Sequence, residues 1–194
     1  MYERTLRLLA LAMLLAAGGA AAAGATPNRG SQIVDENRDA TADADWASRL
    51  KAKLADFEQA SGIRVLVEFH AKSPPADEDQ HPGDYMRALS AKLGVIGHGV
   101  LMVHFADDPD WRVWVGDDLT PKFVGKAGTA EGFTASGAMH NAKEAYLDAA
   151  MANAGAAYSA LEGAKPDPKA AASGLLLRLQ TDALVAGLRA KLAP

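Results

Sequence analysis

Gly99-Val-Leu-Met-Val-His-Phe-Ala106 is the most apolar stretch after the first 25 residues, and the other elements are arranged around it. An apolar run of this length, bounded by turn residues, is typical of a strand that is buried on both faces. The turn follows at once as Asp107-Asp108-Pro109-Asp110, and a second strand pattern follows as Trp111-Arg-Val-Trp-Val-Gly116. The two runs therefore predict a β-hairpin of antiparallel strands.

Helix and strand patterns also precede this hairpin. Residues 46–57 place apolar side chains three and four positions apart, which predicts a helix that Asp45 caps and Ser61-Gly62 ends. Residues 63–69 form a β-branched run that predicts a buried strand, and a second helix pattern begins at Asp84. Because a helix separates this strand from the hairpin, we expect it to run parallel to the first strand of the hairpin.

The order of these elements predicts an α/β fold. We expect a three-layer α/β/α sandwich around a small mixed sheet of three strands, plus a C-terminal helix. Residues 26–162 are expected to form the α/β domain, with a glycine-rich loop over residues 125–137 followed by a long alanine-rich helix. Residues 163–194 are expected to form a linker and a C-terminal amphipathic helix.

The composition excludes several classes of site. The chain has 194 residues, 49% of them hydrophobic, a formal net charge of −4 and no cysteine. Disulfides, thiolate nucleophiles and cysteine-based zinc or iron–sulfur sites are therefore excluded. An acidic chain without a basic field is also not expected to bind nucleic acid.

The first 25 residues have the layout of a secretory signal peptide. A short basic start with Arg4 and Arg7 leads into an uncharged run from Leu8 to Ala23, with small residues suited to cleavage after Ala23 or Ala25. An uncleaved anchor is the alternative, but the run is shorter than the roughly 20 residues of a membrane span. We therefore expect an exported protein of the periplasm or cell envelope.

The C-terminal helix carries an apolar stripe that includes Leu177, Leu184 and Leu188. Charged residues such as Arg178 and Asp182 interrupt it, so we expect no transmembrane span in the mature chain. Packing of this stripe on the domain is the simpler interpretation. Contact with an envelope protein partner or a membrane surface is the alternative.

Several motifs, in order, resemble the TPM domain, a family of thylakoid lumen, bacterial envelope and animal membrane proteins. The similar motifs are Ile33-Val34-Asp35, Ala60-Ser-Gly-Ile-Arg-Val-Leu-Val67, Asp84-Tyr85 with the later Leu93-Gly-Val-Ile-Gly97, Gly99-Val-Leu-Met-Val103 and Arg112-Val-Trp-Val-Gly116. The resemblance covers residues 33–155 and implies an α/β sandwich. It also implies weak binding of a divalent cation, and an acid phosphatase activity that some members have been assigned.

The chain departs from the family directly after Gly116. The family continues with Tyr-Gly-Leu-Glu-Gly, whereas this chain has Asp117-Asp118-Leu-Thr-Pro, and residues 125–137 have no recognised counterpart. The loop in which the function of the family is usually placed is therefore different here.

Clustered aspartates are the candidate metal ligands, because Ca²⁺ and Mg²⁺ prefer carboxylate and carbonyl oxygens. Since the hairpin strands are antiparallel, Asp107 and Asp108 are expected at the opposite end of the sheet from Asp117 and Asp118. The sheet topology favours the former pair. The resemblance favours Asp35 with the latter, and we predict a divalent-cation site of Asp35, Asp117 and Asp118. The alternative is that all of them are solvated turn residues.

Two functions follow from these observations. The first is a non-catalytic accessory or assembly factor of the cell envelope, with or without a bound divalent cation. The second is a metal-dependent hydrolase of phosphate esters that resembles the acid phosphatases. No organic cofactor is expected and no catalytic residue is assigned, because the sequence holds no zinc-protease, phosphate-loop or serine-hydrolase motif.

Overall fold

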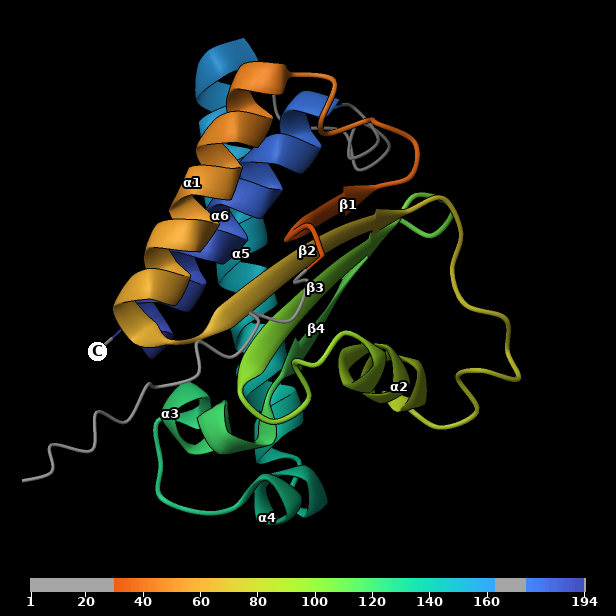
Figure 1. Ribbon diagram of the computed structural model, residues 1–194, viewed down its shortest axis with the longest axis vertical. Helices are drawn as coiled ribbons and strands as arrows, with labels where there is room; N and C mark the ends of the chain where they lie inside the picture. Colours follow the sequence, from red (N-terminus) through yellow and green to blue (C-terminus); the bar gives the residue numbers. More distant parts are fainter. Residues whose placement is uncertain (1–29, 163–173, 194) are drawn as a thin grey trace, which may run out of the picture. The chain divides into compact units, whose positions relative to one another are not determined.

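The computed structural model describes residues 30–162 and 174–193, so the predicted signal peptide and the linker lie outside the described residues. A single sheet has the strand order β1-β2-β3-β4 (Figure 1). Its strands are β1 (Ile33–Asp35), β2 (Arg64–His70), β3 (Gly99–Phe105) and β4 (Asp110–Val115). β1, β2 and β3 are parallel and β4 is antiparallel to β3, as the sequence predicted for the last three strands.

Six α-helices are described. They are α1 (Ala44–Ser61), α2 (Asp84–Lys92), α3 (Thr120–Val124), α4 (Ala130–Ala135), α5 (Ala138–Glu162) and α6 (Gly174–Leu192). A 3₁₀ turn, η1 (Asp117–Leu119), joins β4 to α3.

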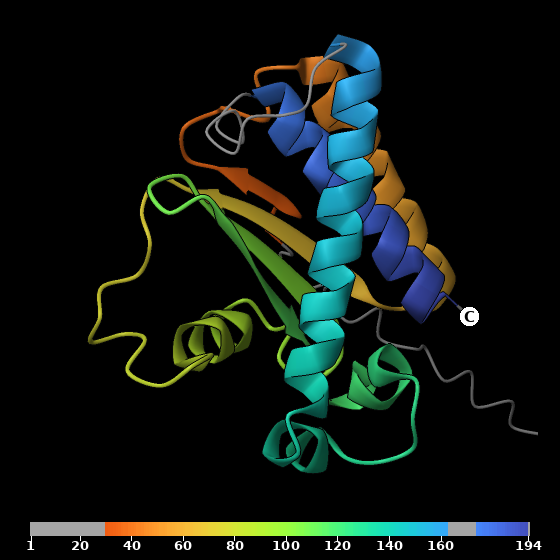
Figure 2. The same cartoon turned by 180° about the vertical axis from the view of Figure 1, so that it is seen from behind.

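The elements form the predicted α/β fold in three layers, with helices on both faces of a mixed sheet. Helices α1, α5 and α6 lie on one face and α2 lies on the other (Figures 1 and 2). Alternate side chains of β3 enter the two layers: Val100 and Met102 join the core under α1, α5 and α6, whereas Leu101 and Val103 join the core under α2. Every residue of β3 is buried, in agreement with its apolar sequence.

The two helical crossovers have opposite hands. The chain moves from β1 to β2 to β3 in one direction across the sheet, yet α1 covers one face and α2 the other. Only one of the two can therefore be the right-handed crossover that parallel strands normally adopt.

Three local predictions were wrong. The sequence predicts three strands and not β1, because a strand of three residues is too short to show a period. Helix α4 lies inside the expected loop of residues 125–137, where Thr129 caps it by accepting from the amide of Gly132 (3.1 Å). Helix α1 is capped by Asp43, which accepts from the amide of Trp46 (2.9 Å), and not by Asp45.

Helix α6 packs on the domain. Leu177, Leu184 and Leu188 are buried in the core that also contains residues of α1 and α5. The indole of Trp46 donates to the carboxylate of Asp182 (3.0 Å), so α1 and α6 are also joined by a polar contact. In the part of the chain that the structure describes, no helix is both long and apolar enough to cross a membrane.

A close backbone contact holds the end of β4 beside the start of β3. The amide of Gly116 donates to the carbonyl of Gly99 (2.8 Å), and the amide of Asp118 donates to the carbonyl of Gly97 (3.0 Å). A Cβ atom on Gly116 would collide with the carbonyl oxygen of Gly97, and its distance from the amide nitrogen of Gly99 would be 2.9 Å. Glycine at position 116 is thus required by the closeness of two backbone segments.

We expect Gly116→Ala to lower the free energy of unfolding by about 1–3 kcal/mol, because backbone atoms cannot move aside as side chains do. Gly97→Ala is the matched control: its Cβ would meet only the carboxylate of Asp118 at 3.8 Å, an ordinary contact. Its effect should stay within about 0.5 kcal/mol. Urea denaturation of both variants measures the difference, and equal stabilities would contradict this account of the contact.

Candidate functional site

The three aspartates of the predicted metal site do not meet. Asp35 ends β1 and pairs with Phe69, so it lies where the parallel strands end. Asp117 and Asp118 follow β4, whose last residue, Val115, pairs with Val100 at the start of β3. Asp35 therefore lies at the opposite end of the sheet from Asp117 and Asp118. It lies at the same end as Asp107 and Asp108 of the hairpin turn.

Asp35 organises the loop between β1 and α1. Its Oδ2 accepts from the amide of Ala40 (3.1 Å) and from both the amide (2.8 Å) and the hydroxyl (3.0 Å) of Thr41. Its Oδ1 is buried without a hydrogen-bond partner. Asp35 also lines a small cavity of about 30 Å³, together with Asp39 and His104.

Asp117 and Asp118 are more open to solvent. Asp117 Oδ2 lies 3.8 Å from Arg87 Nη2, and Asp118 Oδ2 lies 3.9 Å from His98 Nδ1. Over residues 30–162 and 174–193, no three His, Asp or Glu side chains are grouped so as to hold a metal ion. Binding of Ca²⁺ or Mg²⁺ by these aspartates stays a prediction.

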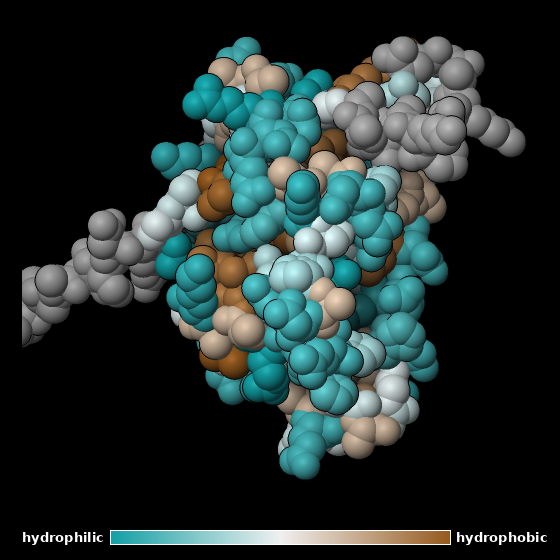
Figure 3. Space-filling model, turned by 90° about the vertical axis from the view of Figure 1, so that its right-hand side faces the viewer, coloured by the Kyte–Doolittle hydropathy of each residue, from teal (hydrophilic) through white to brown (hydrophobic). Residues whose placement is uncertain are grey.

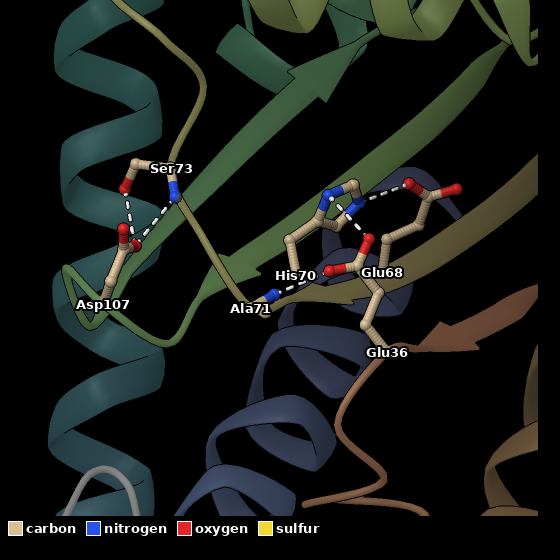
Figure 4. A network of polar contacts seen from close by, with 6 residues as sticks. All are labelled: Glu36, Glu68, His70, Ala71, Ser73 and Asp107. Atoms are coloured by element: carbon tan, nitrogen blue, oxygen red, sulfur yellow. Dashed lines mark hydrogen bonds and ion pairs between the residues drawn. The ribbon is translucent and has the colours of Figure 1, made fainter.

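A polar network that the sequence analysis missed lies at the ends of the parallel strands (Figure 4). His70, the last residue of β2, donates from Nε2 to the carboxylate of Glu68 (2.8 Å), and its Nδ1 lies 3.7 Å from Glu36. Glu36 also accepts from the amide of Ala71 (2.7 Å). The one available sequence signal was the i, i+2 spacing of Glu68 and His70, which puts both on one face of a strand.

A second contact in Figure 4 joins the loop after β2 to the hairpin. The carboxylate of Asp107 accepts from the amide (2.7 Å) and the hydroxyl (2.9 Å) of Ser73. Asp107 therefore fixes the position of a loop, as Asp35 does.

The two histidines of the sheet, the half-buried His70 and the buried His104, have opposite electrostatic surroundings. The hydrogen bond to Glu68 raises the pKa of His70 against the opposing effect of burial, and the charges of Glu36 and Glu68 add to the rise. Burial lowers the pKa of His104, and the charge of Asp39 offsets this only in part. His70 is therefore held toward its protonated form and His104 toward its neutral form.

A groove of about 1200 Å³ lies along the outer side of β4. Its walls are α2 on one side and α4 with the first half of α5 on the other, and the two walls lie on either side of the sheet (Figure 2). The surface over α2 and the loop before it is mainly hydrophilic, with only small separate apolar patches (Figure 3). The groove, rather than this outer surface, is therefore the candidate binding surface.

Trp114 occupies the groove between two cations. The guanidinium carbon of Arg87, from α2, lies 5.1 Å from the ring centroid, and Lys143 Nζ, from α5, lies 5.6 Å from it. The neighbouring tryptophan of β4, Trp111, is 5% exposed and lies in the core, whereas Trp114 is half-buried.

Comparisons with known proteins give little further information. No protein-family model matches the chain, and no curated protein matches it. Among solved structures, the chain is similar to the NMR structure of the N-terminal domain of the cg2496 protein from Corynebacterium glutamicum. The identity is 13% over 84% of each chain and the TM-score is 0.44, which carries no argument about function. The TPM resemblance stays a prediction.

We expect Asp35→Ala to destabilise the protein by about 1–3 kcal/mol in buffer free of divalent cations, because three donors of the β1–α1 loop lose their acceptor. Asp118→Ala, at an exposed site, should change stability by no more than about 0.5 kcal/mol. Chemical denaturation measures both. If Asp35→Ala is as stable as the wild type, this carboxylate has no structural role.

We also expect His70 to titrate above the ordinary value of 6.5 and His104 below it in a pH series of imidazole NMR spectra. The raised pKa of His70 means that its stabilising effect is complete below pH 6.5 and is lost as the pH rises through the folded pKa. The lowered pKa of His104 acts the other way, destabilising the fold as the pH falls below 6.5.

The stability difference between wild type and His70→Gln should therefore shrink as the pH rises from 5 to 8.5, measured by thermal melting. The control is His140→Gln, since the imidazole of His140 is exposed and lies 3.9 Å from the carboxylate of Glu144. A difference that does not vary with pH would refute the His70–Glu68 interaction.

Proposed function

We propose that this chain is an exported, non-catalytic accessory or assembly domain of the cell envelope that binds a partner protein in the groove beside β4. The observation that carries the proposal is the groove itself. It is about 1200 Å³ in volume, runs along a sheet edge, and contains a half-buried tryptophan between Arg87 and Lys143.

The polar groups at the strand ends support binding over catalysis. Asp35 and Asp107 each hold a loop through hydrogen bonds to backbone amides and hydroxyls, and Glu68 is occupied by His70. The hydrolase hypothesis places Asp35 with Asp117 and Asp118 around one cation, but these residues lie at opposite ends of the sheet. This arrangement weakens the hydrolase hypothesis.

The groove replaces the C-terminal helix as our candidate for the contact with the partner. The apolar stripe of α6 is part of the core, so it offers no comparable surface. Asp117 lines the groove, so a divalent cation bound at Asp117 and Asp118 remains compatible with the accessory role. Export and envelope location rest on the signal-peptide pattern and on the TPM resemblance.

Site-specific photo-crosslinking in the native cell envelope tests the proposal. A photoreactive amino acid at Thr134, an exposed groove residue, should give a discrete adduct with an envelope protein. The matched control is the same amino acid at Lys51, an exposed residue of α1 outside the groove, which should give none.

Two results would overturn the proposal. One is an adduct pattern that is the same at both positions, or absent at both. The other is turnover of a chromogenic phosphate ester by the purified chain with Ca²⁺ or Mg²⁺ that is lost in Asp117→Asn/Asp118→Asn, which would favour the hydrolase.

A further inference from the structure

The outer edge of β4 presents unpaired backbone groups to the groove. The register pairs Leu101 with Trp114, and the amide of Gly116 donates to β3. Because backbone direction alternates along an antiparallel strand, Trp114 turns its N–H and C=O toward β3, whereas Val113 and Val115 turn theirs away. Within the described part of the chain, no strand pairs with this outer side of β4.

An unpaired strand edge at the floor of a groove favours one kind of ligand. Amide and carbonyl groups spaced two residues apart match the backbone of another extended chain, as in recognition by strand addition. Val113 and Val115 line the groove, together with residues of α2 and of α5. The occupant that satisfies the edge is therefore an extended polypeptide rather than a helix or a small molecule.

The charges of the groove indicate what this polypeptide carries. Two of its cations already have anionic neighbours: Arg112 bonds to Asp79 (2.6 Å), and Arg87 lies 3.8 Å from Asp117. Lys143 contacts the ring of Trp114 and has no carboxylate within ion-pair distance among the residues described. Burial also lowers the pKa of Lys143, which is the electrostatic cost of a desolvated cation without a counter-charge.

Five acids also line the groove: Asp84, Asp110, Asp117, Glu131 and Glu144. Asp84 bonds to His81 (3.0 Å), Glu144 lies 3.9 Å from His140, and Asp110 accepts from the amide of Trp111 (2.8 Å). Among the residues described, none of the five forms an ion pair with Lys143. An incoming carboxylate would meet Lys143 directly.

We propose that the groove binds an extended peptide segment of the partner as a fifth strand along β4, with a carboxylate of that segment paired to Lys143 above Trp114. This inference rests on the proposed function and specifies the chemistry of the partner at the same groove. The carboxylate is an Asp or Glu side chain or a free C-terminus.

The probe is a random twelve-residue peptide library, displayed with free C-termini and selected on the purified full chain. Selected peptides should carry alternating β-branched residues and an Asp, a Glu or a terminal carboxylate. Replacing that carboxylate by the amide should weaken binding about tenfold, measured by fluorescence anisotropy. Methylation of one backbone amide that pairs with β4 should weaken it by a similar factor, and the amides of Val113 and Val115 should shift in NMR spectra.

Matched variants separate the effect of the Lys143 charge from general effects on folding and binding. Lys143→Met should weaken the carboxylate peptide about tenfold and leave the amide peptide within twofold, with an unchanged melting temperature as the check on folding. Lys126→Met, at an exposed lysine outside the groove, should leave both peptides unchanged.

Three results would overturn this inference while leaving the proposed function intact, provided that the crosslink at Thr134 forms. They are selection of no peptide, selected peptides that tolerate N-methylation, and carboxylate binding that does not depend on Lys143. A concentration-dependent dimer that shifts the amides of Val113 and Val115 would also overturn it, because a second copy would then fill the edge. Loss of the crosslink at Thr134 is the separate result that removes the proposed function.

Discussion

Complete burial of β3 governs how the other elements are placed around it. Its apolar side chains point both ways, so water must be excluded from both faces of the sheet at once. Neither layer of helices alone can do this: α2 covers one face, and α1, α5 and α6 cover the other. The same need to exclude water explains the strands beside β3, because β2 and β4 flank it and shield its backbone. Every other described element packs either against β3 or against an element that covers β3.

This constraint explains what the sequence predicted correctly. The run from Gly99 to Ala106 indicated a central strand, and Asp107-Asp108-Pro109-Asp110 indicated the hairpin that follows it. Both signals are local and strong. The strand β1 and the helix α4 were missed because each is short and stabilised by contacts with distant residues rather than by its own pattern.

The candidate site was less predictable than the fold, for a topological reason. Whether Asp35 lies near Asp117 depends on the direction in which β1 pairs with β2, and a strand of three residues gives no sequence signal of its direction. The cluster of Arg87, Trp114 and Lys143 draws on three elements that are far apart in the chain. Only the packing of α2 and α5 on opposite sides of β4 brings these side chains together, and no spacing in the sequence encodes that.

The contact between α1 and α6 has a consequence for folding. Trp46 and Asp182 are 136 positions apart, and α6 contributes residues to the core that α1 also enters. A segment that ends before α6 therefore lacks one wall of this core and leaves the apolar side of α1 uncovered. Contacts of such long sequence separation also slow folding, since the intervening loop must close before they form.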